Sequence, residues 1–146
     1  SEYINFSFSN GSVVNILGNV SGLLDNGAGT VEKIPNEYCF YNLFNGAEAI
    51  MYVSDTFFSS NVPVDPTSND GDYKPLELNK NCYEGAFQDC SNMINGPYLP
   101  ANWNDAESND IANCYKHLFK GCNKINDVKL GYKGNFDNDQ GSCFYD

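Results

Sequence analysis

The sequence predicts an α/β solenoid in which each repeat contributes one short helix and short strands, preceded by an N-terminal β-hairpin. Two observations favour this fold class. The first residues alternate apolar and polar side chains, as a β-strand does, and a Cys-aromatic motif then recurs through the rest of the 146-residue chain. The predicted organisation is a hairpin or cap over residues 1–30, followed by irregular repeats over 31–146.

The N-terminal residues have the pattern of a β-hairpin. Ile4, Phe6 and Phe8 alternate with polar residues, and the apolar stretch 13–17 would return as the second strand. The Asn10-Gly11 pair between them is a strong turn signal, because both residue types tolerate positive φ.

The recurring motif is a cysteine followed by an aromatic residue. It occurs at Cys39, Cys82, Cys114 and Cys143. In the first three copies, the fifth position after the cysteine holds Phe44, Phe87 or Phe119, and the eighth holds Ala47, Cys90 or Cys122. These positions divide the chain into repeats at about 31–53, 74–103 and 104–135, a truncated repeat at 136–146, and an inserted loop at 54–73.

The spacing of the repeated positions within one copy of the motif predicts a helix. Residues four apart lie on one stripe of an α-helix, so Cys82, Ala86 and Cys90 would face the same way over about two turns. Such a short helix is marginal alone, but a stack of helix-plus-strand units can bury its apolar face.

The cysteines are predicted to be structural. On a helix, Cys82 and Cys90 would lie about 12 Å apart, whereas a disulfide needs Cα atoms within roughly 7 Å. Buried free thiols in register are the preferred interpretation, and disulfides between repeats, Cys82–Cys114 or Cys90–Cys122, remain open. Cysteines eight apart with His117 as the lone imidazole do not fit a zinc site, so no metal is predicted.

Composition excludes some partners. The net charge is −11, and all eight basic residues are Lys. A nucleic-acid interface needs a basic face, usually with Arg, so no nucleic-acid partner is predicted. No apolar run approaches the roughly 20 residues of a membrane span, so this segment is not expected to insert into a membrane.

No catalytic residue or cofactor is predicted. A nucleophile–base pair would have to use His117, which is better explained as a rim residue, and the many carboxylates are not placed in pairs by any motif. The stretch 65–77 nearly fits a calcium loop, but Pro66 stands at the first ligand position, so a polar turn is preferred.

Aromatic residues outside the repeat frame are the candidate ligand contacts. Phe57 and Phe58 lie in the inserted loop, and Trp103 lies in a polar loop. Loop aromatics can anchor a protein or sugar ligand, or they can pack against the flank of the repeats, and packing is slightly preferred.

The repeats resemble those of the BspA-type leucine-rich-repeat surface proteins. The matching stretches are IPNEYCFYNLFNGA, NKNCYEGAFQDCSNMINGPYLPA and IANCYKHLFKGCNKIN. The resemblance implies a short leucine-rich-repeat-like solenoid that is secreted or displayed on a bacterial cell surface. It further implies a non-enzymatic adhesion or recognition module that binds a host or bacterial surface protein or a glycan.

Two alternative functions are left open. One is a structural or host-recognition component of a bacteriophage virion, in which neighbouring subunits of a larger assembly would contact the module. The other, a glycoside-processing enzyme, has only unplaced carboxylates in its favour.

Overall fold

The computed structural model describes residues 3–25, 28, 30–67, 73–99 and 114–129. The described part of the chain contains no helix with the length and apolar character of a membrane span. Its regular elements are short, and they are β1 (Val14–Ile16), α1 (Gly22–Asp25), β2 (Ile50–Val53), β3 (Ser59–Pro63) and β4 (Tyr73–Pro75).

The predicted α/β solenoid with a helix and strands in each repeat is wrong. The only α-helix in the described residues is the four-residue α1, and the strands form two separate two-stranded sheets, β1 with β2 and β3 with β4. The predicted N-terminal hairpin is also wrong. The chain does turn at Asn10 and Gly11, but β1 then pairs in parallel with β2 and not with residues 3–8.

The three described Cys-aromatic motifs form turns where helices were predicted. We call residues 38–47, 81–90 and 114–122 the turn segments. Within each segment, alternate N–H groups donate to the carbonyl three residues back, as Leu43 does to Phe40 at 3.2 Å. The remaining N–H groups of the first two segments donate to the next segment, as Phe44 does to Ala86 at 2.7 Å and Phe87 to Leu118 at 3.1 Å. In the first two segments, about half of the backbone hydrogen bonds are therefore local, and the other half join segments that are far apart in sequence.

A left-handed residue at every fourth position explains why these segments are not helices. In the second segment Asn81, Gly85 and Asp89 have φ of 54°, 66° and 59°. A right-handed helix requires negative φ throughout, so each of these residues redirects the chain. The N–H groups of Gly85 and Asp89 themselves donate to the next segment, at the carbonyls of Lys116 and Lys120. The equivalent left-handed positions in the other two segments are Tyr38, Asn42, Gly46, His117 and Gly121.

Two rows of stacked rings run across the turn segments. Tyr83 lies between Phe40 at 5.7 Å and Tyr115 at 5.8 Å between centroids, with interplanar angles of 11° and 7°. The second row consists of Phe6, Phe44, Phe87 and Phe119. These rings form much of the core, because nearly all of them are buried.

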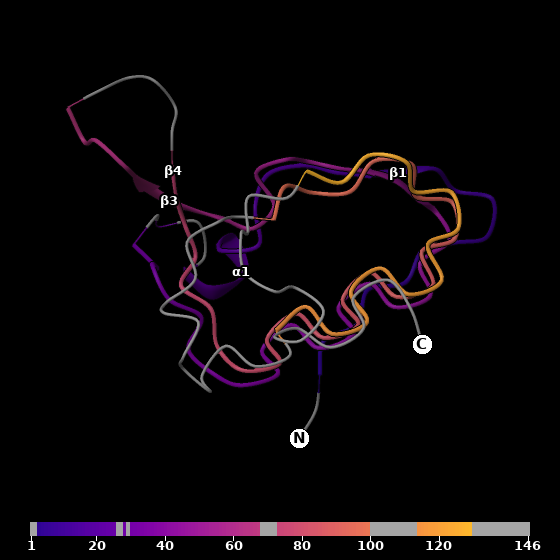
Figure 1. Cartoon of the computed structure of the whole chain (residues 1–146), viewed down its shortest axis with the longest axis horizontal. Helices are drawn as coiled ribbons and strands as arrows, with labels where there is room; N and C mark the ends of the chain where they lie inside the picture. The colour runs from indigo at the N-terminus through magenta and orange to yellow at the C-terminus, as the bar shows by residue number, and fades with distance from the viewer. Residues whose placement is uncertain (1–2, 26–27, 29, 68–72, 100–113, 130–146) are drawn as a thin grey trace.

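A second wall is formed by parallel pairing of extended segments. β1 pairs with β2, Tyr52 of β2 forms a parallel bridge with Asn95, and Asn95 forms another with Asp127. Figure 1 shows segments from the early, middle and late parts of the described chain running alongside one another on both long sides of the molecule. The two walls enclose the core between them.

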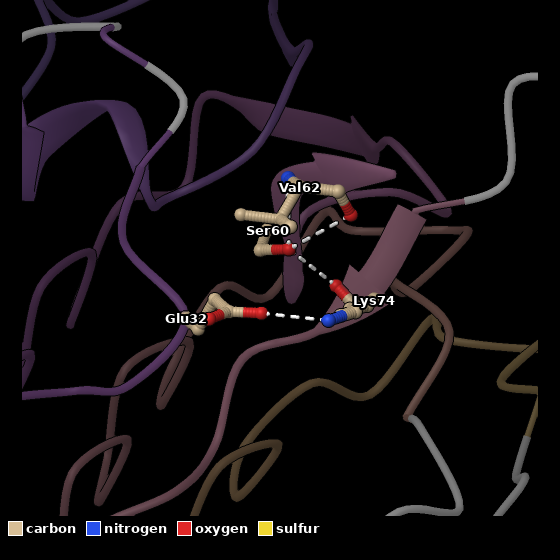
Figure 2. Close-up of polar contacts among 4 residues, drawn as sticks. All are labelled: Glu32, Ser60, Val62 and Lys74. Carbon is tan, nitrogen blue, oxygen red and sulfur yellow. Dashed lines mark hydrogen bonds and ion pairs between the residues drawn. The ribbon is translucent and has the colours of Figure 1, made fainter. Parts of the chain in front are cut away.

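β3 and β4 form an antiparallel arm that projects from one end of the molecule (Figure 1). The buried Ser60 hydroxyl donates to the Lys74 carbonyl at 2.7 Å and accepts from the Val62 N–H at 3.1 Å. Lys74 Nζ also contacts Glu32 Oε1 at 2.8 Å, which ties the base of the arm to the body (Figure 2). The predicted inserted loop 54–73 is thus structured at its start.

Candidate functional site

A polar cleft lies between the N-terminal segment and the end of the first turn segment. It has a volume of about 230 Å³. Residues 6–12, residues 45–49 and Asn92 line it. We call this hollow the N-terminal cleft.

Backbone hydrogen bonds at both ends of residues 6–12 hold the cleft open. At one end the Phe6 N–H donates to the Leu43 carbonyl at 2.8 Å, and at the other the Val14 N–H donates to the Ala49 carbonyl at 2.8 Å. Between these points the Ser12 N–H donates to Ser9, closing a turn in which Gly11 has a φ of 79°. The chain is thus fixed at both ends of a loop in which Phe8 packs against the core.

The cleft is lined by hydroxyl, amide and carboxylate groups with spare hydrogen-bonding capacity. In the described residues, no side-chain partner is found for Ser7, Ser9, Asn10, Ser12 or the Glu48 carboxylate. The Asn45 amide donates to Asn42 Oδ1 at 3.1 Å, and the Asn92 amide donates to the Glu48 carbonyl at 2.9 Å. The two amides are therefore held in place, while the hydroxyls and the carboxylate can bind a ligand.

Glu48 is the only titratable side chain among the residues that line the N-terminal cleft. A second hollow of about 270 Å³ adjoins it and shares Ser12, Glu48, Ala49 and Asn92. Lys124 lines that hollow and donates to Asn92 Oδ1 at 2.8 Å. Glu48 therefore lines both hollows, whereas Lys124 lines only the second.

The predicted ligand-contact residues lie elsewhere. Phe57 and Phe58 are only 3% and 1% exposed. Phe57 packs against Phe87 at 5.2 Å, and Phe58 packs against Tyr83 at 4.4 Å, both edge-on to the stacked rows. Their rings offer almost no surface to a ligand, so we assign them to packing. Trp103 lies outside the described residues.

The cysteines at described repeat positions lie in register, as free thiols. The first cysteine has an equivalent place in each turn segment, at Cys39, Cys82 and Cys114. This is shown by two backbone bonds: the Phe40 N–H donates to the Cys82 carbonyl, and the Tyr83 N–H donates to the Cys114 carbonyl. Cys90 Sγ and Cys122 Sγ donate to the carbonyls of Phe44 and Phe87 at 3.2 and 3.1 Å. Cys143 and the truncated repeat 136–146 lie outside the described residues.

Burial makes these thiols poor nucleophiles. Desolvation raises the pKa of Cys39 to about 11 and that of Cys122 to about 12, and it raises the pKa of Cys90 further. Since the thiolate is the reactive form, the raised pKa values make Cys39, Cys90 and Cys122 weak nucleophiles near neutral pH.

The other chemical candidates are placed as turn residues. His117 occupies the left-handed position equivalent to Asn42 and Gly85, which explains its place in the repeat. Asp65 Oδ1 accepts from the Thr67 hydroxyl at 2.7 Å and from the Thr67 N–H at 2.9 Å, and these two bonds, the hydroxyl bond first, lower the pKa of Asp65. Within the described residues, no three His, Cys, Asp or Glu side chains are grouped to hold a metal ion.

Sequence reasoning missed the residues of the N-terminal cleft. The Asn10-Gly11 turn was a usable signal, but it was interpreted as the tip of a hairpin. The cleft depends on residues 6–12 lying against residues 45–49, a contact between segments nearly 40 residues apart that no local pattern specifies.

Comparison with family models, with curated proteins and with solved structures finds no match for this chain. The relationship to BspA-type proteins therefore stays a prediction from the repeat motif.

Proposed function

We propose that this chain is a non-enzymatic recognition module that binds a ligand in the N-terminal cleft. The observation that carries the proposal is a row of polar side chains without protein partners on a hydrogen-bonded frame. Ligand sites are typically preformed hollows with a few well-placed polar groups, and the cleft has this character. The proposed extracellular, cell-surface setting is supported only by the repeat resemblance.

The chemistry of the cleft favours binding over catalysis. Hydrolysis of a glycosidic bond generally uses two carboxyl groups on either side of the bond. Glu48 is the single carboxylate that lines the cleft, and the Lys124 ammonium in the adjoining hollow is bonded to Asn92. One carboxylate among hydroxyls and amides can orient a ligand, but it does not form an acid–base pair.

A binding screen with a blocked variant tests the proposal. The chain is applied to arrays of glycans and of extracellular proteins, beside Ser9→Trp, which places an indole in the cleft. Asn36→Trp is the control, since Asn36 is exposed and does not line the cleft. We expect at least one ligand to be captured by the wild type and by Asn36→Trp, and lost with Ser9→Trp. Capture of nothing, or capture unaffected by Ser9→Trp, would contradict the proposal.

A further inference from the structure

We propose that the ligand of the N-terminal cleft is a neutral oligosaccharide, with one pyranose ring against Phe6. This inference rests on the proposed function and names its ligand class. It combines three properties of the cleft: a partly open aromatic ring, a group of serine hydroxyls with the Asn10 amide that have no side-chain partner in the described residues, and a negative charge.

Phe6 supplies a surface for the apolar face of a sugar ring. Its ring stacks on Phe44 at 5.5 Å with an interplanar angle of 27°, at the end of the row that continues to Phe87. Phe6 nevertheless remains 38% exposed and lines the cleft. The buried rings beneath it hold Phe6 in place, so little conformational entropy is lost when a ligand packs on it.

The polar groups next to Phe6 fit the hydroxyl edge of a sugar. Ser7, Ser9 and Ser12 can each donate one hydrogen bond and accept two, and the Asn10 amide provides both donors and acceptors. The Glu48 carboxylate accepts from hydroxyl groups, and such charged hydrogen bonds are stronger than neutral ones. A ligand with an apolar face and a hydroxyl rim matches this combination better than an apolar ligand does.

Charge and size narrow the ligand class. Glu48 in the cleft and a net charge of −11 disfavour uronic acids, sialic acids and phosphorylated sugars, and the Lys124 ammonium in the adjoining hollow is already bonded to Asn92. Pockets for drug-sized ligands are usually about 300–1,000 Å³, so a cleft of about 230 Å³ suits one ring. The adjoining hollow of about 270 Å³ offers room for the next unit of a chain.

Calorimetric titration of the chain with neutral oligosaccharides, and with matched sialylated and uronic-acid-containing forms, tests the inference. We expect at least one neutral oligosaccharide to bind, at least tenfold more tightly than its acidic form. Phe6→Ala should weaken this binding at least tenfold, whereas Tyr98→Ala should leave it unchanged. Tyr98 is a matched control because its side chain is also 38% exposed and does not line the cleft.

A second pair of variants tests the role of charge. Glu48→Gln should weaken the neutral ligand severalfold and reduce discrimination against the acidic form. Glu37→Gln, an exposed carboxylate outside the cleft, should change neither. Thermal unfolding of Phe6→Ala checks that the fold is retained, and Ser9→Trp provides a cleft variant that leaves Phe6 in place.

The outcomes separate this inference from the proposed function. Binding of only acidic glycans or only proteins, lost with Ser9→Trp, would overturn the neutral-sugar assignment and leave the recognition module intact. Neutral-sugar binding unaffected by Phe6→Ala would also overturn the assignment. Comparing binding to immobilised glycans with binding to the same sugars in solution distinguishes a ligand displayed on a surface from a soluble sugar.

Discussion

At the residue scale, small side chains at left-handed positions decide whether the turn segments can stack. Gly85 has a φ of 66°, and a Cβ there would overlap the side chain of Asn42 in the neighbouring segment. Gly121 stands in the same relation to Asp89. In both cases the glycine leaves room for the Asn or Asp side chain of the preceding segment. Gly46, with a φ of 78°, has open space around its Cα.

This contrast gives a matched pair of substitutions. Gly46→Ala should lower the free energy of unfolding by about 1 kcal/mol, the cost of a left-handed alanine. Gly85→Ala should cost about 3 kcal/mol, because steric overlap with Asn42 is added to the same backbone cost. Urea unfolding measures both. Adding Asn42→Gly to Gly85→Ala should recover most of the difference, and equal costs for the two alanine variants would contradict this account.

At the element scale, the arm formed by β3 and β4 depends on one buried hydroxyl. The stretch 54–73 was predicted to be an inserted loop because Ser, Asp, Asn and Pro dominate it. Part of it is a strand because Ser60, fully buried, serves both the Val62 N–H and the Lys74 carbonyl. The sequence alone does not show that Ser60 has this role, since its partner Lys74 lies 14 positions away.

Two substitutions at the base of the arm should differ in effect. Ser60→Ala removes the buried hydroxyl that bonds to the Val62 N–H and the Lys74 carbonyl, which should cost about 1–3 kcal/mol in urea unfolding. Lys74→Met removes the ion pair with Glu32, whose two side chains are about half exposed, and should cost less than about 1 kcal/mol. A larger loss for Lys74→Met than for Ser60→Ala would show that the ion pair, not the hydroxyl, fastens the arm.

At the scale of the whole molecule, the core is one continuous body of rings and thiols. The stacked rows pass through all three turn segments, and Phe57 and Phe58 fill the space beside them. The described cysteines lie in or against the same core, and only Cys39 is part-exposed. A change that acts on all these thiols should therefore act on the stability of the whole fold.

Alkaline pH supplies such a change. The usual thiol pKa is 9.0, whereas burial raises the pKa of Cys39 to about 11 and that of Cys122 to about 12. Above about pH 9 the unfolded chain loses thiol protons that the folded chain retains, so the free energy of unfolding should fall as pH rises from about 9 to about 12. Below about pH 8 the thiols should contribute no pH dependence.

Urea unfolding at pH 7 and pH 10 measures this effect. Cys122→Ala should reduce the loss between the two pH values, and Ala47 shows that alanine fits the equivalent position of the first segment. Thiol titration of denatured, unreduced protein should count mostly free cysteines. Stability that is equal at both pH values, or a denatured chain with no titratable thiol, would contradict the free-thiol core.

The sequence by itself determined which segments are equivalent, but not their conformation. The spacing of Cys39, Cys82 and Cys114 predicted helices, and the structure has turn segments there, which backbone hydrogen bonds and stacked rings join to one another. A spacing of four residues places side chains on one side of a helix, and it also places them at equivalent positions of consecutive four-residue turns. The spacing alone therefore does not distinguish the two structures. The Asn, Asp and Gly residues at most of the left-handed positions distinguish the two, since they favour left-handed φ over a helix interior; Tyr38 and His117 occupy the others.

Only the tertiary structure decided where the N-terminal cleft lies and which aromatic residues are exposed. Phe6 and Phe57 are both phenylalanines outside the turn segments, yet Phe57 is buried between stacked rings and Phe6 ends a row with part of its ring open. Local sequence gives each residue its preferences for φ and for burial. The partners that complete a cleft or cover a ring come from segments about 40 residues away, and their placement is set by the packing of the whole core.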